Sequence, residues 1–295
     1  MSLIVKNVNK SFGDRKVVDN LSFELSKPGV FGLLGTNGAG KTTTIRMILG
    51  IIKKDSGDIT WNNKEVTRKN VNFGYLPEER GLYPKSKIYD QLMYFANLKG
   101  MNKVDADKAI KYWLEKLKVS EYVNYTAEKL SKGNQQKIQF ITSVLHNPDL
   151  IVLDEPFSGL DPVNTEILSN VMKELIKEGK YIIMSSHQMS SIEEFCTDLV
   201  ILNRGKTVLK GNLKEIKNSY KSSKILLETD NDVKKIINKL KLNILSNNDG
   251  TYIIEVNEDE NKKLFKELVD NNISISKYEV IKPSLHEIFI EKVGE

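Results

Sequence analysis

A glycine-rich segment near the N-terminus has the composition of a phosphate-binding loop. Residues 35–42 read Gly-Thr-Asn-Gly-Ala-Gly-Lys-Thr and fit the pattern G-x-x-x-x-G-K-[ST]. Glycines let backbone N–H groups surround phosphate oxygens, and a helix beginning near Lys41 would add the partial positive charge of its N-terminus. The Lys41 ammonium can reach nucleotide phosphates, and the Thr42 hydroxyl can bind Mg²⁺. A plain glycine turn before a helix is the alternative interpretation. The expected phosphate-binding residues are Gly35, Thr36, Asn37, Gly38, Ala39, Gly40, Lys41, Thr42 and Thr43.

Two adjacent carboxylates end a second apolar segment. Leu150–Leu153 is uninterrupted and apolar, and Asp154 and Glu155 follow it directly. A carboxylate at the carboxyl end of a parallel strand faces the ligand crevice of an α/β sheet. Asp154 is therefore a candidate Mg²⁺ ligand together with Thr42, and Glu155 is a candidate general base that polarises an attacking water. The simpler alternative is an Asp-Glu pair that caps the next helix.

The first 211 residues alternate short β-rich runs with helical segments, which predicts an α/β fold. Apolar runs without polar alternation are typical of parallel strands that helices cover on both faces. Residues 88–128 instead repeat apolar residues at helical spacing, so we expect a helical insert over about 88–146. The expected buried strands are Val30–Leu34, Leu150–Leu153, Tyr181–Ser185 and Leu199–Leu202.

The remaining residues predict a second, smaller domain. Residues 212–223 are rich in lysine and serine and are expected to form a linker. Residues 224–295 then give the order β-α-β-β-α-β of a ferredoxin-like α+β fold, with a hairpin signal at Asn247–Gly250. A last amphipathic segment runs from Pro283 to Lys292. We therefore expect an accessory α+β domain at the C-terminus.

Composition excludes several classes of protein. The chain has 295 residues, 40% of them hydrophobic, and its longest unbroken run of apolar or glycine residues, Gly29–Gly35, has seven residues. A membrane-spanning helix needs about 20 such residues, so we expect no span. The first ten residues lack the apolar core of a signal peptide. Because Cys196 is the only cysteine, the sequence holds neither an internal disulfide nor a four-cysteine zinc site, and the cytoplasm is the default compartment.

Charge argues against a nucleic-acid partner. The net charge is +5, which divides into +6 over residues 1–211 and −1 over residues 212–295. The basic residues are 39 lysines and only 5 arginines. Arginine is the residue that reads bases and phosphates with paired hydrogen bonds, so this imbalance favours a solvated surface.

Three further segments follow the phosphate-binding loop in a particular order, and an aromatic residue precedes it. Residues 130–136 read Leu-Ser-Lys-Gly-Asn-Gln-Gln, residues 158–161 read Ser-Gly-Leu-Asp, and residues 185–187 read Ser-Ser-His. Phe12 lies 29 residues before Lys41. With these segments, residues 1 to about 211 resemble the ATPase subunits of ABC transporters. Taken alone, each segment would be an ordinary capped helix, a turn, a structural histidine or a core aromatic residue.

The resemblance implies ATP as the nucleotide and a role for each segment. Ser131 and Gly133 would cap the γ-phosphate of ATP bound to the opposite subunit, and Asp161 would lie in a loop that crosses the dimer interface. His187 would contact the γ-phosphate, and Phe12 would stack on the adenine. The sequence departs from the family at Lys132 and Asn134, within the signature, and at Glu78, which stands where the family has a glutamine. The Glu78 carboxylate can still coordinate Mg²⁺.

One branch of the family is resembled most. The segments Glu78–Pro84 and Pro283–Phe289, with the modified signature, are similar to ATPase subunits of ABC-2 type exporters of sodium, drugs and antibiotics. The implied cofactors are ATP and Mg²⁺. The implied partners are a separate integral-membrane permease and a second ATPase subunit, identical or homologous, and no nucleic acid is expected. The implied location is cytoplasmic, on the inner face of the cell membrane.

Two other hypotheses remain open at this stage. One is a soluble ABC ATPase acting on nucleic acid or ribosomes, although the usual second ATPase cassette, cysteine pairs and long coiled coils are missing from the sequence. The other is a degenerate, regulatory ATP-binding protein, which the departures at Glu78, Lys132 and Asn134 suggest. The transported substance cannot be deduced, because the substrate pathway would lie in the permease.

Overall fold

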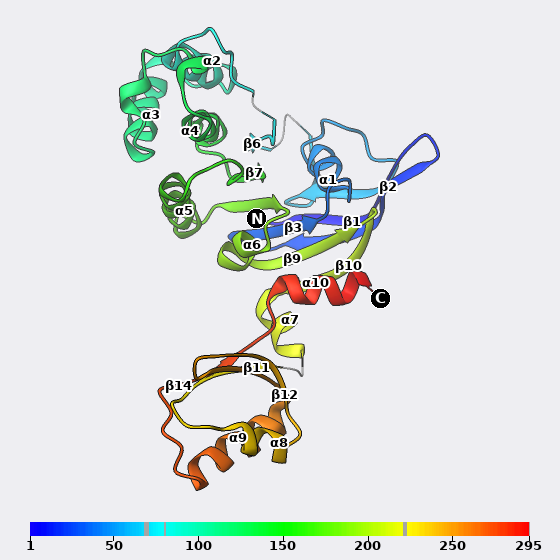
Figure 1. Ribbon diagram of the computed structural model, residues 1–295. Coiled ribbons are helices and arrows are strands. Elements are labelled where there is room, and N and C mark those ends of the chain that lie inside the picture. The colour runs from blue at the N-terminus through cyan, green and yellow to red at the C-terminus, as the bar shows by residue number, and fades with distance from the viewer. Residues whose placement is uncertain (68–70, 80, 221–222, 295) are drawn as a thin grey trace. The chain divides into compact units, whose positions relative to one another are not determined.

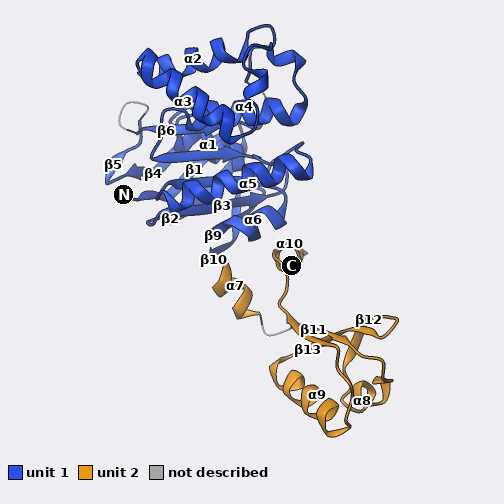
Figure 2. Ribbon diagram, turned by 90° about the vertical axis from the view of Figure 1, so that its left-hand side faces the viewer, with its two compact units in different colours: residues 1–211 blue, residues 212–295 orange. Residues whose placement is uncertain are grey.

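The computed structural model describes residues 1–67, 71–79, 81–220 and 223–294. Arg80, within the segment that resembles exporter subunits, and residues 221–222 of the expected linker lie outside the described residues. The chain divides into two compact units, residues 1–211 and residues 212–295, which Figure 2 colours separately.

A ten-stranded sheet organises the first unit (Figure 1). Its spatial order is β5-β4-β1-β2-β10-β9-β3-β8-β7-β6, and the strands from β9 to β6 pair in parallel. The β1, β2, β4 and β5 strands at the other end pair with one another in antiparallel fashion. The strands are β1 (Leu3–Phe12), β2 (Arg15–Leu25), β3 (Gly29–Gly35), β4 (Ser56–Trp61), β5 (Lys64–Glu65), β6 (Phe73–Leu76), β7 (Leu150–Asp154), β8 (Tyr181–Ser186), β9 (Cys196–Asn203) and β10 (Lys206–Asn212).

Helices cover both faces of the central strands, which explains why those strands are uniformly apolar. Every residue of β3, β7 and β8 is buried. Phe31 and Leu33 of β3 belong to the core cluster that includes Ile45 and Ile48 of α1. Gly32 points the other way, toward α6, because a Cβ placed there would lie 3.0 Å from the Ile192 side chain. The helices on the sheet are α1 (Lys41–Ile48), α5 (Pro162–Lys177) and α6 (Met189–Phe195).

The segment expected as a helical insert contains three helices grouped together in both ribbon views (Figures 1 and 2). They are α2 (Ile88–Leu98), α3 (Lys103–Lys116) and α4 (Lys132–Val144), with short 3₁₀ turns at Ser120–Tyr122 and Ala127–Lys129. The α4 helix lies directly on β6, since a Cβ on Gly74 would be 1.8 Å from the Ser143 carbonyl oxygen. Glycine at position 74 is thus what allows this close packing.

The second unit has a four-stranded antiparallel sheet in the order β12-β13-β11-β14. This is the strand order of the ferredoxin-like α+β fold. At the predicted hairpin, Asp249 and Gly250 both have positive φ, 43° and 83°, as a type I′ turn requires. The elements are β11 (Ser223–Glu228), α8 (Lys234–Lys239), β12 (Asn243–Asn248), β13 (Thr251–Val256), α9 (Glu258–Asp270), β14 (Lys277–Ile281) and α10 (Leu285–Gly294).

Two details of this unit differ from the sequence prediction. The expected linker contains α7 (Leu213–Ser219), whose Leu213 and Ile216 are buried and whose first turn is capped by the Asn212 side chain. The last strand, which the sequence predicts over Ile273–Ile281, begins only at Lys277. The expected linker is rich in lysine, so its composition gave no sign that Leu213 and Ile216, three residues apart, form the apolar face of a short helix.

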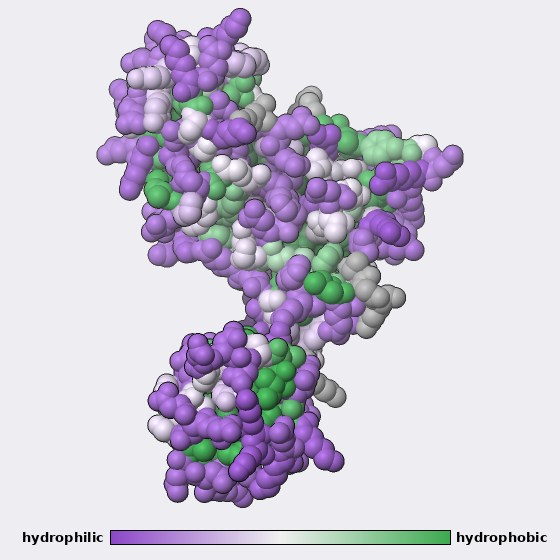
Figure 3. Space-filling model, in the orientation of Figure 1, coloured by the Kyte–Doolittle hydropathy of each residue, from purple (hydrophilic) through white to green (hydrophobic). Residues whose placement is uncertain are grey.

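The surface shown in Figure 3 is mostly hydrophilic on both units. Among the residues that the structure describes, no helix combines the length and the apolar composition that crossing a bilayer requires.

Candidate nucleotide-binding site

The phosphate-binding loop connects the end of β3 to the start of α1. Gly40 occupies the N-cap position of α1 with φ of 105°, in the left-handed region. A Cβ at this position would lie 2.5 Å from the Val17 carbonyl oxygen, so both the backbone angle and the space require glycine. This constraint places Lys41 and Thr42 in the first turn of the helix, at the end where N–H groups attract anions.

Lys41 is a buried cation held by backbone oxygens of its own loop. Its Nζ donates to the Gly35 carbonyl at 2.7 Å and to the Thr36 carbonyl at 3.4 Å, and lies 4.0 Å from Glu155 Oε1. A buried ammonium group needs such partners because desolvation is costly. The side chain is thus already positioned at the loop, next to the carboxylate expected to act on water.

Asp154 presents a buried carboxylate with one oxygen still available. Its Oδ1 accepts a hydrogen bond from the Ser185 hydroxyl, while Oδ2 has no hydrogen-bond partner among the described residues. Burial raises the pKa of Asp154, and the neighbouring Glu155 adds to this, while the Ser185 and Thr42 hydroxyls and Lys41 oppose it. A buried carboxylate with one unpartnered oxygen, close to the Thr42 hydroxyl, fits a divalent cation with oxygen ligands.

Glu155 lies in a strained and well-defined position. Its φ is 53°, which is unusual for a residue with a side chain, and its N–H donates to the Ser185 carbonyl at 3.1 Å. Its Oε1 is 2.9 Å from His187 Nδ1, and its Oε2 accepts from the Ser186 hydroxyl at 3.2 Å. The His187 side chain is about half exposed. The structure therefore brings the expected base and the expected switch histidine into direct contact.

A cleft of about 350 Å³ collects many of the expected site residues. Phe12 stands at it with 51% of its surface exposed, and the Lys10 ammonium lies 5.2 Å from the Phe12 ring centroid. An exposed aromatic face is what stacking on a base needs. Arg15 and Val17 also line the cleft but carried no signal in the sequence, because their proximity depends on the turn between β1 and β2. The lining residues are Phe12, Arg15, Val17, Asn37, Gly38, Ala39, Gly40, Lys41, Thr42, Thr43, Glu78 and Glu155.

The signature and the loop at Asp161 are not among the residues that line this cleft. Ser131 is the N-cap of α4, its hydroxyl accepting from Asn134 N–H at 3.3 Å, and Gly133 is buried in the first turn. Asp161 is the N-cap of α5, and the hydrogen bond from the Asn164 N–H lowers its pKa most. Both caps stabilise helix starts in this chain.

Gln91, the first glutamine in the sequence after position 78, does not line the cleft either. It is buried, accepting from Tyr83 N–H at 2.8 Å and donating to the Ser86 carbonyl at 2.9 Å.

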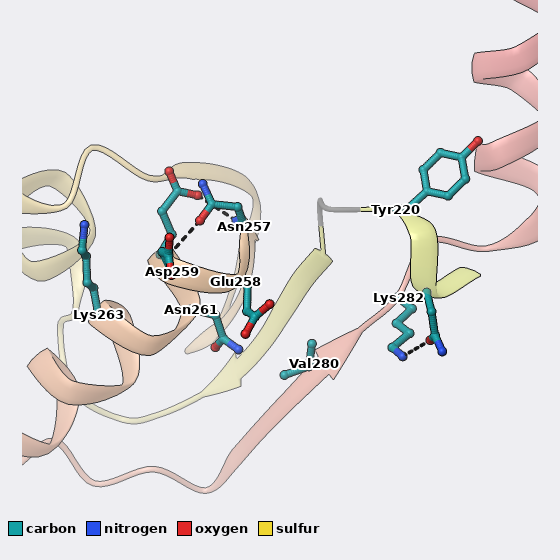
Figure 4. Close-up of a pocket in the computed structure, with 10 residues that line it drawn as sticks. Tyr220, Asn257, Glu258, Asp259, Asn261, Lys263, Val280 and Lys282 are labelled. Atoms are coloured by element: carbon teal, nitrogen blue, oxygen red, sulfur yellow. Dashed lines mark hydrogen bonds between the residues drawn. The ribbon is translucent and has the colours of Figure 1, made fainter. Parts of the chain in front are cut away.

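A larger cavity of about 760 Å³ lies in the second unit and holds none of the expected site residues (Figure 4). Its Asn257 and Glu260 form the capping box of α9, and Lys282 donates to Asn218.

The ten-stranded sheet, the loop from β3 to α1 and the carboxylates after β7 define a P-loop ATPase. A family model described as "ABC transporter" matches residues 18–158, and one described as "ATP-binding protein DrrA1-3-like, C-terminal domain" matches residues 211–293. The chain belongs to the family of ABC transporter ATP-binding proteins.

Known ABC transporter ATP-binding proteins are similar to this chain over nearly its whole length. The ABC transporter ATP-binding protein YhaQ of Bacillus subtilis (strain 168) is 48% identical over 294 residues, 99% of this chain and 98% of that protein. The linearmycin resistance ATP-binding protein LnrL of the same strain is 28% identical over 305 residues, 99% of this chain and 98% of LnrL. A solved structure described as an ATP-binding subunit of an ABC transporter superposes with a TM-score of 0.68 and 28% identity, covering 74% of this chain and 93% of that one.

The predicted fold class and family are therefore confirmed. The chain is an ATP-binding subunit whose ATPase domain hydrolyses ATP to power transport, with a membrane permease as its partner. The alternative of a soluble ATPase acting on nucleic acid or ribosomes is not favoured.

Proposed function

We propose that this chain binds Mg²⁺-ATP in the cleft beside the phosphate-binding loop and hydrolyses it, as one of two subunits, to drive an ABC-2 type exporter. The observation that carries the proposal is the meeting of three features at one place. They are the buried Lys41 ammonium, the unpartnered Oδ2 of Asp154, and the contact between Glu155 and His187.

The residues of this chain divide the work of hydrolysis. The loop N–H groups and Lys41 hold the phosphates, with Lys41 exchanging its carbonyl partners for phosphate oxygens. Asp154 and the Thr42 hydroxyl would hold Mg²⁺, which supplies charge neutralisation at the phosphates. Glu155 Oε1 accepts a proton from the attacking water, and His187 orients that carboxylate and contacts the γ-phosphate. Phe12 offers its exposed face to the adenine.

A second ATPase subunit would complete each site. The resemblance to the family implies that Ser131 and Gly133 serve ATP bound to another copy, and neither residue lines the cleft of its own chain. Asp161, at the start of α5, would lie near the same interface. The same arrangement holds for an identical and for a homologous second subunit.

Membership of the family supports the proposed partner and location. We infer a permease in the cell membrane, with this chain on its cytoplasmic face. LnrL, similar over nearly its whole length, is described as a resistance protein, which favours export. The test is purification with the membrane protein encoded beside it, followed by measuring phosphate release with ATP in the presence and absence of Mg²⁺. Phosphate release that is independent of Mg²⁺, or absent with the permease bound, would contradict the proposal.

Replacement of Glu78 tests the Mg²⁺ part of the site. Two unit charges about 4 Å apart interact by about 4 kcal/mol at an effective dielectric constant of 20, and Mg²⁺ would cancel much of the repulsion between Glu78 and the γ-phosphate. Glu78→Gln should keep kcat within about tenfold, roughly 1.4 kcal/mol, while raising the Mg²⁺ concentration for half-maximal activity. Glu78→Ala should lose more. The measurement is a Mg²⁺ titration at fixed ATP, and curves that superimpose on wild type would show that Glu78 is a solvated loop residue.

Removal of the second unit tests its independence from the ATP site. No residue of the 350 Å³ cleft comes from beyond Gly211. A chain ending at Gly211 should therefore bind ATP with a Kd within about threefold of the full chain, or less than 1 kcal/mol. Equilibrium binding of a fluorescent ATP analogue measures this. A folded chain, by circular dichroism, that no longer binds nucleotide would show that the second unit supports the site.

A further inference from the structure

The segment between β6 and α2 carries Glu78 and is held by two buried carboxamides from the helical insert. Gln139 of α4 binds the first part of this segment, and Gln91 of α2 binds the second part. Both glutamines are almost fully buried, with exposures of 3% and 2%. A buried amide group costs free energy unless it makes hydrogen bonds, so the bonds of these two side chains stabilise the segment in one conformation.

Gln139 makes three hydrogen bonds to the backbone around Glu78. Its Nε2 donates to the Pro77 carbonyl at 3.2 Å and to the Glu79 carbonyl at 2.9 Å. Its Oε1 accepts from the Gly81 N–H at 3.3 Å. The two donated bonds thus fix the residues on either side of Glu78, whose own side chain lines the nucleotide cleft.

The same face of α4 also contacts the backbone next to Glu155. Gln136, three residues before Gln139 and therefore on the same side of the helix, donates from Nε2 to the Pro156 carbonyl at 3.1 Å. Pro156 follows Glu155 directly. One helix, which begins at the Ser131 N-cap, thus contacts the backbone beside both Glu78 and Glu155.

We propose that Gln139 is a positioning residue that sets Glu78 in the nucleotide cleft, so that the placement of α4 determines how tightly the site holds Mg²⁺. This rests on the proposed Mg²⁺-ATP hydrolysis. Glu78 is exposed, and no other residue that the structure describes donates a hydrogen bond to its side chain, so we attribute its position to the backbone bonds with Gln139. Loss of those bonds leaves the carboxylate present but no longer held toward the cleft.

Gln139→Met tests this with little change in side-chain volume. Mg²⁺ titrations of ATP hydrolysis by the full chain should show the half-maximal concentration raised about fivefold or more, with kcat at saturating Mg²⁺ within about threefold. Affinity for a fluorescent ATP analogue without Mg²⁺ should be unchanged. Ser143→Ala is the matched control, since it removes a buried hydroxyl of α4 that donates within the helix, to the Phe140 carbonyl. It should leave the Mg²⁺ curve unchanged.

A second variant and a second measurement make the result independent of folding and of activity. Gln139→Glu keeps the acceptor and the length but cannot donate when ionised, so it should shift the Mg²⁺ curve in the same direction. Amide hydrogen exchange should accelerate at Gly81 in Gln139→Met by about tenfold, while Tyr83, which is bonded to Gln91, changes less.

The outcomes separate the inference from the proposed function. A wild-type chain without Mg²⁺-dependent hydrolysis would overturn the proposed function, whatever the exchange data show. A shifted Mg²⁺ curve in Glu78→Gln together with a wild-type curve in Gln139→Met would overturn the role of Gln139. Unchanged exchange at Gly81 in Gln139→Met would overturn the role as well.

Discussion

Replacing Glu155 with glutamine should lower kcat for ATP hydrolysis by about 10²- to 10⁴-fold, the usual contribution of a general base. Glutamine keeps the size of the side chain and can still contact His187 and Ser186, but it cannot take a proton from water. The Kd for ATP should be within a few-fold of wild type, because Lys41 and the loop that hold the phosphates are untouched. The variant should therefore accumulate as a stable dimer with ATP bound.

Single-turnover hydrolysis and size-exclusion chromatography with ATP measure the two effects. Glu178→Gln is the control, an exposed carboxylate at the end of α5 that is remote from the cleft, and it should behave as wild type. Turnover by Glu155→Gln within about threefold of wild type would show that another group activates the water.

Activity should require two chains, and mixing two inactive variants should restore part of it. Ser131→Arg would place a bulky cation at the signature, and Glu155→Gln removes the base, so each variant alone should lose about 10²-fold or more. If Ser131 serves the opposite chain, a mixed dimer contains one site with both defects and one intact site. Since a symmetric interface pairs the chains at random, an equimolar mixture should recover up to about a quarter of wild-type activity.

The dimer prediction also sets how activity depends on concentration. Specific activity of the wild type should rise with protein concentration through the dimer range, and ATP should lower the concentration needed. A mixture of Glu155→Gln with Lys41→Ala is the control. Both residues act on the ATP bound to their own chain, so each chain of the mixed dimer has a defect in its own site and no intact site can form. Full activity in a monomer at the lowest concentrations would contradict shared sites.

Local patterns predicted the parts of the fold that follow the chain closely. The spacing from Gly35 to Thr42 and the apolar run ending in Asp154 and Glu155 both depend on neighbours in sequence, so their elements could be predicted. The hairpin at Asp249–Gly250 is of the same kind, because its turn type follows from the residues in it. The roles proposed for the site residues stay predictions, those of Glu155, His187 and Asp154 as well as those of Ser131, Glu78 and Phe12.

Contacts made across the fold were not predictable. In the sequence, Gln139 cannot be told from other polar residues of a helix. Its hydrogen bonds to three backbone groups depend on the path that the chain takes after β6. Arg15 joins the cleft because the turn after Phe12 brings it beside Gly38. Neither contact follows from periodicity, which reports burial but not the partner that a buried polar group finds.

Glu155 makes this site a place where stability and activity oppose each other. A residue with a side chain and φ of 53° carries a conformational cost of order 1 kcal/mol, and its carboxylate is buried directly beside that of Asp154. On the proposed role of Glu155 as the general base, replacements at position 155 that relieve this cost, glycine above all, should raise the free energy of unfolding while they remove the group that activates water.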